Sequence, residues 1–343
     1  MSKVEFGFTL GVANPLYPPE KQIENWAEMV RVGQQLGFGL ISTPQHWLAH
    51  PVKWFQPIPL LSRLAAEADR IKLATGILQL PLYNPVDLAE QVATVDAMSK
   101  GRFILGVGLG YREQLFEAVG ARKSDRVGRF TEAIEIMRRL WSGDEVTFHG
   151  KHFRVTKGRI SMTPVQKPHP PIWMAAQSEP AVRRAGEMGF AWYIPPQGDF
   201  NDVKRLWNVY KDALDKAGHP LPAVPLIRYS CIAKDKKTAV EYARAYMQDT
   251  YAMYRPWGLE EKSTVRIHRT FEEEMQRALI GSPEECAEEI NKYVDAFGVT
   301  HVILGIGRPN FRHEDALETL HLIAERLIPN VGRKGQSAQR ARG

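Results

Sequence analysis

Short apolar runs alternate with longer amphipathic segments along almost the whole chain. Eight runs rich in apolar and β-prone residues occupy residues 4–11, 38–43, 71–78, 102–107, 171–176, 189–194, 225–233 and 299–306. Short unbroken apolar runs are typical of strands covered on both faces, as in a parallel sheet. Helical spacing of apolar residues marks the segments 20–36, 57–69, 85–98, 126–141, 179–187, 201–217, 236–253, 283–297 and 313–327. The pattern therefore predicts strands and helices in alternation.

Eight strands that alternate with helices favour an α/β fold, a (β/α)8 TIM barrel, over a doubly wound open sheet as the alternative. The chain has 343 residues, of which 44% are apolar, and this is enough to bury a large core. We expect one barrel domain over residues 1–330, followed by a separate tail at 331–343.

Two segments do not fit a minimal barrel. Residues 144–170 are polar, β-prone and punctuated by proline, so we expect a small strand excursion before the strand at 171–176. Residues 251–281 form a long insertion after the strand at 225–233, on the face where barrel active sites lie. A lid is the functional interpretation of this insertion, and a decorative helical insertion is the alternative.

Most of the net positive charge of the chain comes from the tail. The formal net charge is +6, and the tail carries four basic residues and no acidic one, which leaves +2 for the rest of the chain. We therefore expect a solvated, disordered tail and no nucleic-acid surface on the folded body.

Cysteine content and hydropathy bear on the compartment. Cys231 and Cys286 are the two cysteines, and they provide neither a disulfide framework nor the spacing of a metal site. No run approaches the ~20 apolar residues that span a bilayer, and the first residues lack the layout of a signal peptide. We expect a soluble cytoplasmic protein with no bound metal and no membrane contact.

A glycine cluster follows the run at 102–107. Gly106, Gly108 and Gly110 lie at or just past the end of that predicted strand. Glycine permits close approach of a ligand to the backbone and lets amide groups turn toward it. A flat cofactor is the functional interpretation, and an ordinary tight turn is the alternative, because glycine spacing alone is a weak signal.

Four sequence blocks carry a family resemblance. They are GFGLISTPQHW at 37–47, LATGILQLPLYNPVDLAEQVATVDAMSKGRFILGVGLGY at 73–111, HPPIWMAAQSEPAVRRAGEMG at 169–189 and GSPEECAEEINKYVDAFGVTHVILGI at 281–306. The chain resembles the bacterial luciferase-like flavin-dependent oxidoreductases from about residue 4 to 330. The resemblance implies a (β/α)8 barrel that binds a flavin or deazaflavin ring at the carboxyl ends of its strands.

The resemblance also implies roles for single residues. His46 matches an active-site histidine that would titrate near neutrality, with a structural histidine as the alternative. Gly76 and Ile77 match a non-prolyl cis peptide beside the ring, with an ordinary strand glycine as the alternative. Gln177 and Ser178 match the site of the cofactor phosphate; a simple helix cap at Ser178 is the bland alternative, and the two roles are compatible.

One position departs from the family pattern. Luciferases place a phosphate-binding arginine in the turn that here contains Gly108 and Gly110, but this chain has Leu109 at that position. Tyr111, Arg112 and Arg126 are the candidates to compensate. Tyr111 is also expected to contact the cofactor.

The substrate side of the site is less specific. Arg228 is similar to an arginine of the alkanesulfonate monooxygenases and would bind an anion or stabilise charge; a buried ion pair is the alternative. An apolar pocket that excludes water is expected from aromatic residues near predicted loop ends, and single aromatics in core packing are the alternative. The aromatic candidates are Trp47, Trp192, Tyr254 and Trp257.

Taken with the resemblance, these residues predict a monooxygenase that uses reduced FMN and O2 through a peroxyflavin to oxidise a small organic substrate. His46 and Arg228 would manage protons and charge. A separate NAD(P)H:flavin reductase would supply the reduced FMN, and a homodimer or homotetramer is expected. The alternatives are F420-dependent hydride transfer and a non-catalytic flavin-binding protein.

Overall fold

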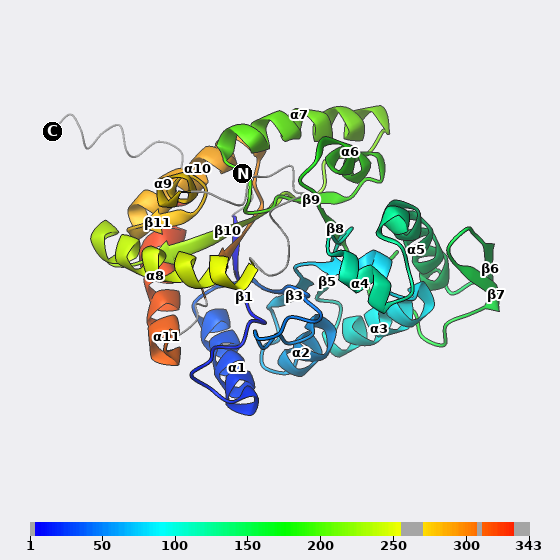
Figure 1. Cartoon of the computed structure of the whole chain (residues 1–343), viewed down its shortest axis with the longest axis horizontal. Coiled ribbons are helices and arrows are strands. Elements are labelled where there is room, and N and C mark those ends of the chain that lie inside the picture. The colour runs from blue at the N-terminus through cyan, green and yellow to red at the C-terminus, as the bar shows by residue number, and fades with distance from the viewer. Residues whose placement is uncertain (1–3, 255–269, 307–310, 333–343) are drawn as a thin grey trace.

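A curled sheet of parallel strands, surrounded by helices, forms the centre of the molecule (Figure 1). The computed structural model describes residues 4–254, 270–306 and 311–332. The eight predicted strands are β1 (Glu5–Thr9), β2 (Leu40–Thr43), β3 (Lys72–Thr75), β5 (Phe103–Gly108), β8 (Ile172–Ala175), β9 (Ala191–Tyr193), β10 (Pro225–Ile232) and β12 (His301–Gly305). Neighbouring strands pair in the order β10-β12-β1-β2-β3-β5-β8-β9, and every pair is parallel.

The predicted closed barrel is confirmed only in part. Within the described residues the sheet is an open path, because β9 and β10 share no regular ladder. One isolated bridge joins them at Ile194 and Leu226. Its hydrogen bonds run from Ile194 N to Pro225 O (2.9 Å) and from Ile227 N to Ile194 O (3.1 Å). The fold is thus an α/β fold with a curled parallel sheet and a weakly bonded seam.

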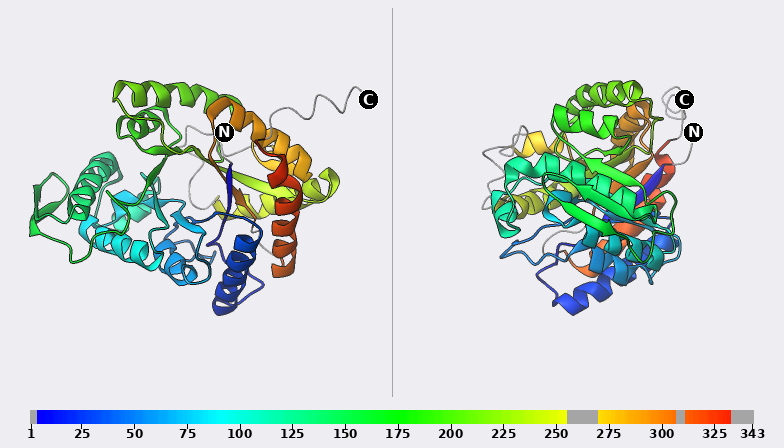
Figure 2. Two further views of the ribbon diagram at one scale, coloured as in Figure 1. Left: turned by 180° about the vertical axis from the view of Figure 1, so that it is seen from behind. Right: turned by 90° about the vertical axis from the view of Figure 1, so that its right-hand side faces the viewer.

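The nine predicted helices are present, and α4 and the short α9 were not predicted. The bounds are α1 (Pro19–Gln35), α2 (Pro57–Leu64), α3 (Pro85–Met98), α4 (Glu113–Ala118), α5 (Arg126–Trp141), α6 (Glu179–Glu187), α7 (Phe200–Lys216), α8 (Lys236–Tyr254), α9 (Phe271–Met275), α10 (Pro283–Phe297) and α11 (His313–Leu322). Local sequence explains several ends. A capping box of Ser282 and Glu285 starts α10, and Gly298 ends it with a φ of 67°. Figure 2 shows from behind that α1 and α11 lie side by side.

The buried apolar residues form an inner and an outer layer. The inner cluster, enclosed by the sheet, contains Leu40, Ala74, Ile104, Trp173, Ala191, Tyr193 and Ile303. A larger cluster fills the space between the outer face of the sheet and the helices. Successive strand residues alternate between these layers. On β9, Tyr193 faces inward and Trp192 faces outward.

The excursion at 144–170 is confirmed as an antiparallel hairpin of β6 (Val146–His149) and β7 (Arg154–Gly158), which projects at the edge of the molecule (Figure 1). The carboxylate of Glu132 on α5 accepts hydrogen bonds from the amides of Lys151, His152 and Phe153, at 2.9 to 3.0 Å. One side chain therefore fixes the hairpin turn to the body.

The insertion after β10 differs from its predicted extent. Helix α8 continues to Tyr254, and β11 (Leu279–Gly281) pairs with β10 as an additional parallel strand. The last three residues of the segment predicted as a lid therefore form a strand of the sheet. Residues 255–269, where the rest of that lid was predicted, and the tail at 333–343 lie outside the described residues.

Two classes of feature are not seen in the described part of the chain. It contains no helix with the length and apolar character needed to cross a membrane. Over the same residues, the histidine, cysteine, aspartate and glutamate side chains form no group of three or more that could hold a metal ion.

Candidate active site

Four segments that carry predicted site residues lie at one edge of the sheet, because parallel strands place all their carboxyl ends together. His46 follows β2, Gly76 follows β3, Gly110 follows β5 and Ser178 follows β8. These four strands are consecutive neighbours in the sheet. We call this edge the mouth of the sheet.

The peptide bond between Gly76 and Ile77 is cis, which confirms the predicted geometry. The backbone on both sides of it is bonded to the β2 end. Gly76 N donates to Thr43 O (2.8 Å), and Gln45 N donates to Ile77 O (3.1 Å). The His46 loop and the Gly76–Ile77 segment therefore form one hydrogen-bonded unit.

Only glycine fits at position 76. A Cβ atom there would lie 2.0 Å from Ser42 Oγ and 3.3 Å from the Tyr193 hydroxyl. These two groups are themselves in contact, with 3.3 Å between their oxygens. Burial raises the pKa of Tyr193, which stays a neutral phenol beneath the mouth. A serine on β2 and a tyrosine on β9 thus support the Gly76 backbone from inside the sheet.

Close contacts within the chain are enough to require glycine at the end of β5 and in the turn after it. A Cβ at Gly106 would lie 1.9 Å from Thr75 O, and one at Gly108 would lie 2.9 Å from Cδ1 of Ile77. Gly110 has a φ of 74° and adjoins the Gln79 side chain. Contact of Gly108 and Gly110 with a cofactor stays a prediction.

His46 lies at the mouth, where its ring meets the edge of the Trp54 ring at a centroid distance of 4.3 Å. Its Nδ1 atom is buried. Burial, and then the charge of Arg112, lower the pKa of His46 from 6.5 to about 3. The predicted titration near neutrality is therefore wrong, because the sequence could not show how this loop folds over the ring. His46 is a neutral hydrogen-bonding group.

Arg112 is buried just past Gly110, but its donors are directed at protein atoms. Its Nη1 donates to Trp47 O (2.8 Å), and its Nη2 donates to Leu48 O and to Gln114 Oε1 (both 3.2 Å). Arg126 donates to a carbonyl of the turn before α5. The structure therefore gives no support to Arg112 as the substitute for the phosphate-binding arginine.

Ser178 occupies the N-cap position of α6, but its side chain makes no capping hydrogen bond. The alternative of a hydroxyl cap is thus not seen. Next to it, Gln177 Nε2 donates to Gln197 Oε1 (2.8 Å). The Ser178 hydroxyl and the first amides of α6 together have the chemistry of a phosphate site; that role stays a prediction.

Arg228 does not lie at the mouth. Its neighbour Ile227 packs with the inner cluster, and Arg228 faces the helices instead. Its guanidinium carbon lies 4.6 Å from the centroid of the Tyr293 ring on α10, and Nη1 donates to Pro195 O and Ile227 O (both 2.9 Å). The structure therefore gives no support to the catalytic assignment of Arg228, whose contacts pack the sheet against α10.

The aromatic residues predicted for the substrate pocket do not share one location. Trp192 is buried in the outer layer and donates to Ala176 O (3.0 Å), so its assignment to the substrate pocket is wrong. Trp47 packs on Tyr83, beside a small cluster next to the mouth, and stays a predicted pocket residue. The Tyr254 side chain and Trp257 lie outside the described residues.

The buried polar atoms at the mouth that make no hydrogen bond within the described residues include Thr43 Oγ1, Gln79 Oε1 and the Tyr111 hydroxyl. Thr43 ends β2, Gln79 ends β4 (Leu78–Gln79) and Tyr111 follows β5. Buried polar groups normally have partners. Two hydroxyls and an amide oxygen match the carbonyl and N–H groups of a flavin-type ring edge, so these residues fit such a cofactor. Sequence reasoning missed Thr43 and Gln79, although each is the last residue of a buried strand.

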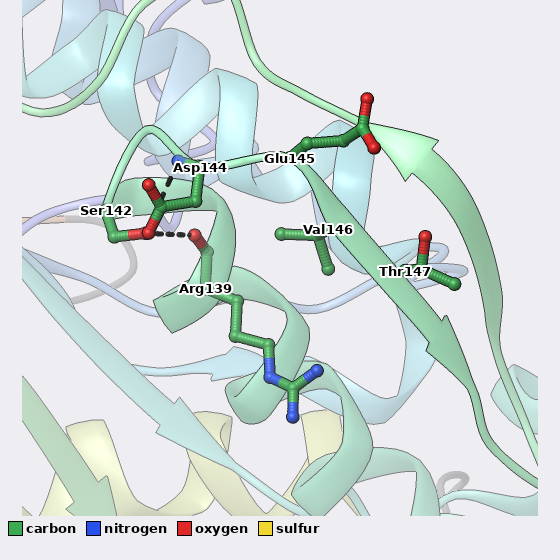
Figure 3. Close-up of a pocket in the computed structure, with 6 residues that line it drawn as sticks. All are labelled: Arg139, Ser142, Asp144, Glu145, Val146 and Thr147. Carbon is green, nitrogen blue, oxygen red and sulfur yellow. Dashed lines mark hydrogen bonds between the residues drawn. The ribbon is translucent and has the colours of Figure 1, made fainter.

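Two cavities lie away from the mouth. One of about 260 Å³, shown in Figure 3, is lined by Arg139, Ser142, Asp144, Glu145, Val146 and Thr147. In it, Ser142 Oγ donates to Arg139 O (2.7 Å), which helps to end α5. A second, of about 230 Å³, lies near the amino-terminal ends of β8 and β9, beside Trp173. Neither contains a residue predicted for the site.

A family model described as luciferase-like monooxygenase matches residues 4–301. The chain belongs to this luciferase-like family. The match covers the four resembling blocks almost completely and includes His46, Gly76, Gly110 and Ser178 at the mouth.

Relatives within the luciferase-like family carry different activities in their names. The chain is 30% identical over 302 residues to an F420-dependent glucose-6-phosphate dehydrogenase of Intrasporangium calvum, covering 79% of this chain and 85% of that protein. It is 26% identical over 249 residues to the oxygenase component of a flavin-dependent trigonelline monooxygenase of Acinetobacter baylyi, covering 71% of this chain and 68% of that protein.

Solved structures support the fold. The crystal structure of the monooxygenase RslO1 from Streptomyces bottropensis has a TM-score of 0.83 with this chain at 23% identity, covering 95% of this chain and 99% of that one. The luciferase-like fold is thus shared, while sequence identity at this level leaves the reaction undetermined.

Proposed function

We propose that this chain is an oxidoreductase that binds reduced FMN at the mouth and uses O2 to oxygenate a small organic substrate. The oxygenase component from Acinetobacter baylyi supports this, because its name implies a separate source of reduced flavin. A separate NAD(P)H:flavin reductase is accordingly part of the proposal. Bound reduced FMN would supply the reaction with O2. The sequence predictions of a homodimer or homotetramer and of a cytoplasmic location remain predictions.

One observation favours oxygenation over hydride transfer: burial and Arg112 lower the pKa of His46 to about 3. Dehydrogenation of an alcohol needs a base whose pKa lies near the working pH. An imidazole with so low a pKa is a poor base for that reaction. His46 is therefore better suited to hydrogen bonding than to taking a proton from an alcohol.

The chain's own residues would hold the cofactor in two places. Thr43, Gln79 and Tyr111 would bond the polar ring edge through the buried atoms that have no hydrogen-bond partner in the described part of the chain. Ser178 and the α6 amides would bind the phosphate. Ile77, whose side chain contacts Gly108, would be an apolar surface for the ring.

F420-dependent hydride transfer is the second candidate. The relative from Intrasporangium calvum favours it, because that protein is named as an F420-dependent dehydrogenase and is 30% identical. F420 shares the polar ring edge of a flavin but reacts poorly with O2, so binding preference and oxygen dependence separate the two candidates.

An anaerobic fluorescence titration with FMN, reduced FMN and F420, followed by an air pulse on the complex formed, tests the proposal. Preferential binding of reduced FMN and an oxygen-dependent absorbance transient are expected. Preferential binding of F420 without an oxygen-dependent change would overturn the FMN proposal in favour of the second candidate. Binding of none would refute both.

The phosphate assignment has its own control. Ser178→Ala is expected to weaken the binding of reduced FMN by about tenfold, since one charge-assisted hydrogen bond is lost. Reduced riboflavin lacks the phosphate, so its binding is expected to be unchanged. An equal loss for both ligands would place the phosphate elsewhere.

A further inference from the structure

The loop after β2 is closed by its own side chains. Gln56 Nε2 donates to His46 O (3.3 Å), while Trp47 Nε1 donates to Gln56 Oε1 (2.7 Å). Trp54 Nε1 donates to Pro44 O (2.9 Å) and places its ring against His46. These contacts shape the loop internally, but they do not bind it to the β5 turn.

Arg112 makes that connection. Its guanidinium donates to the carbonyl groups of Trp47 and Leu48, the two residues directly after His46. Leu48 has a left-handed φ of 50°, a conformation that costs energy in a non-glycine residue and persists only when neighbouring contacts support it. A rigid fork of donors on one carbon suits two adjacent carbonyl groups better than a lysine ammonium does.

We propose that Arg112 is a positioning residue that binds the His46 loop to the β5 turn, so that His46 and the turn at Gly110 and Tyr111 hold a fixed spacing across the mouth. This rests on the proposed function in one respect: the spacing matters because the cofactor ring would lie between them. No relative's name assigns such a role to this arginine.

The electrostatics agree with this geometry. Among the described residues, Arg112 supplies the charge that acts on His46, and it adds to burial in lowering the pKa of His46. The Trp54 ring covers His46 without adding charge. Arg112 thus has two separable effects: a fork that holds carbonyl groups, and a charge that adds to burial in disfavouring the protonated imidazole.

Two substitutions separate these effects. Arg112→Lys keeps the charge and loses the fork, whereas Arg112→Gln loses the charge. Arg102→Lys is the matched control, because Arg102 also donates to two backbone carbonyls, those of Ala65 and Ile71, but at the opposite edge of the sheet. A purely structural role for Arg112 would make its variants behave like the control.

The His46 imidazole is followed by NMR in the whole protein without cofactor, and its signal is assigned with His46→Gln. Arg112→Gln is expected to move the His46 pKa upward from about 3. In Arg112→Lys we expect a nearly unchanged pKa, about tenfold weaker binding of reduced FMN, and faster amide exchange at Val52, whose N–H donates to Ala49 O in this loop. Arg102→Lys is expected to change none of the three.

Unchanged exchange at Val52 in Arg112→Lys would overturn the proposal that the fork holds the loop. An unchanged His46 pKa in Arg112→Gln would refute the separate effect of the charge. Equal effects in Arg102→Lys would overturn the proposal as well, since they would show a general loss of stability. If neither reduced FMN nor F420 binds the wild-type protein, the proposed function fails. The NMR and exchange results still decide the role of Arg112.

Discussion

Gly76→Ala tests the support of the mouth from inside the sheet. The added methyl group would lie 2.0 Å from Ser42 Oγ, far inside contact distance, and 3.3 Å from both Ser42 Cβ and the Tyr193 hydroxyl. The serine oxygen is therefore the main obstacle. Removing it with Ser42→Ala should relieve most of the overlap, because the two remaining contacts at 3.3 Å are tight but need only small shifts.

The expected free energies follow from these contacts. Gly76→Ala should lower the free energy of unfolding by about 1–3 kcal/mol, the usual range for overpacking a dense core. Ser42→Ala should cost about 1 kcal/mol through its hydrogen bond to Tyr193. Because one atom causes most of the overlap, the double variant should be more stable than additivity predicts, by about 1–2 kcal/mol.

Urea unfolding of the wild type, both single variants and the double variant measures this coupling. Gly305→Ala is the control, since a Cβ there meets its nearest atoms at 3.8 Å, which is ordinary contact. Its effect should be small. Additive free energies in the double variant, or a Gly76→Ala protein as stable as the wild type, would refute this account of the Gly76 site.

Three further predictions concern other contacts. Burial lowers the pKa of His301 to about 4, with Lys72 adding to the effect and Glu5 opposing it. Between pH 6.5 and 4 the unfolded chain therefore binds more protons than the folded one, so the free energy of unfolding decreases as the pH is lowered. In urea unfolding, His301→Asn should reduce the decrease between pH 7 and 4.5 by about 2–3 kcal/mol. A decrease as large as that of the wild type would contradict this. Glu132→Ala should cost about 2 kcal/mol and speed amide exchange at residues 151–153, since three amides lose their acceptor; unaltered exchange would show that the hairpin is held otherwise. Arg228→Met should lower the free energy of unfolding by about 1–3 kcal/mol, since the contacts to Pro195 and Tyr293 are lost, but it should leave the binding of reduced FMN intact. A folded variant that cannot bind reduced FMN would show that Arg228 belongs to the cofactor site.

Hydrophobic periodicity predicted the strands and helices well, because each buried strand is a compact apolar run between turn residues. It did not predict β11, whose three residues lie at the end of a polar insertion, or α4, which is six residues long. The seam between β9 and β10 was equally invisible, since it depends on where two strands separate and not on their composition.

Site residues fixed by backbone geometry were easier to predict than those fixed by side-chain direction. The Gly76–Ile77 peptide followed from the family pattern. Arg228 and Trp192 were misplaced because both strands are buried on two faces, so the sequence pattern does not show which residue faces inward. The low pKa of His46 arises from burial and then from the charge of Arg112, and both depend on how the chain folds around the ring.

A crystal structure of the protein grown anaerobically with reduced FMN tests the central claim most directly, because it locates the cofactor. We expect the ring against Ile77 and Gly108, its polar edge bonded to one or more of Thr43, Gln79 and Tyr111, and the phosphate at Ser178. Reduced FMN bound away from the mouth, such as in the cavity beside Trp173 at the opposite ends of β8 and β9, would contradict the account.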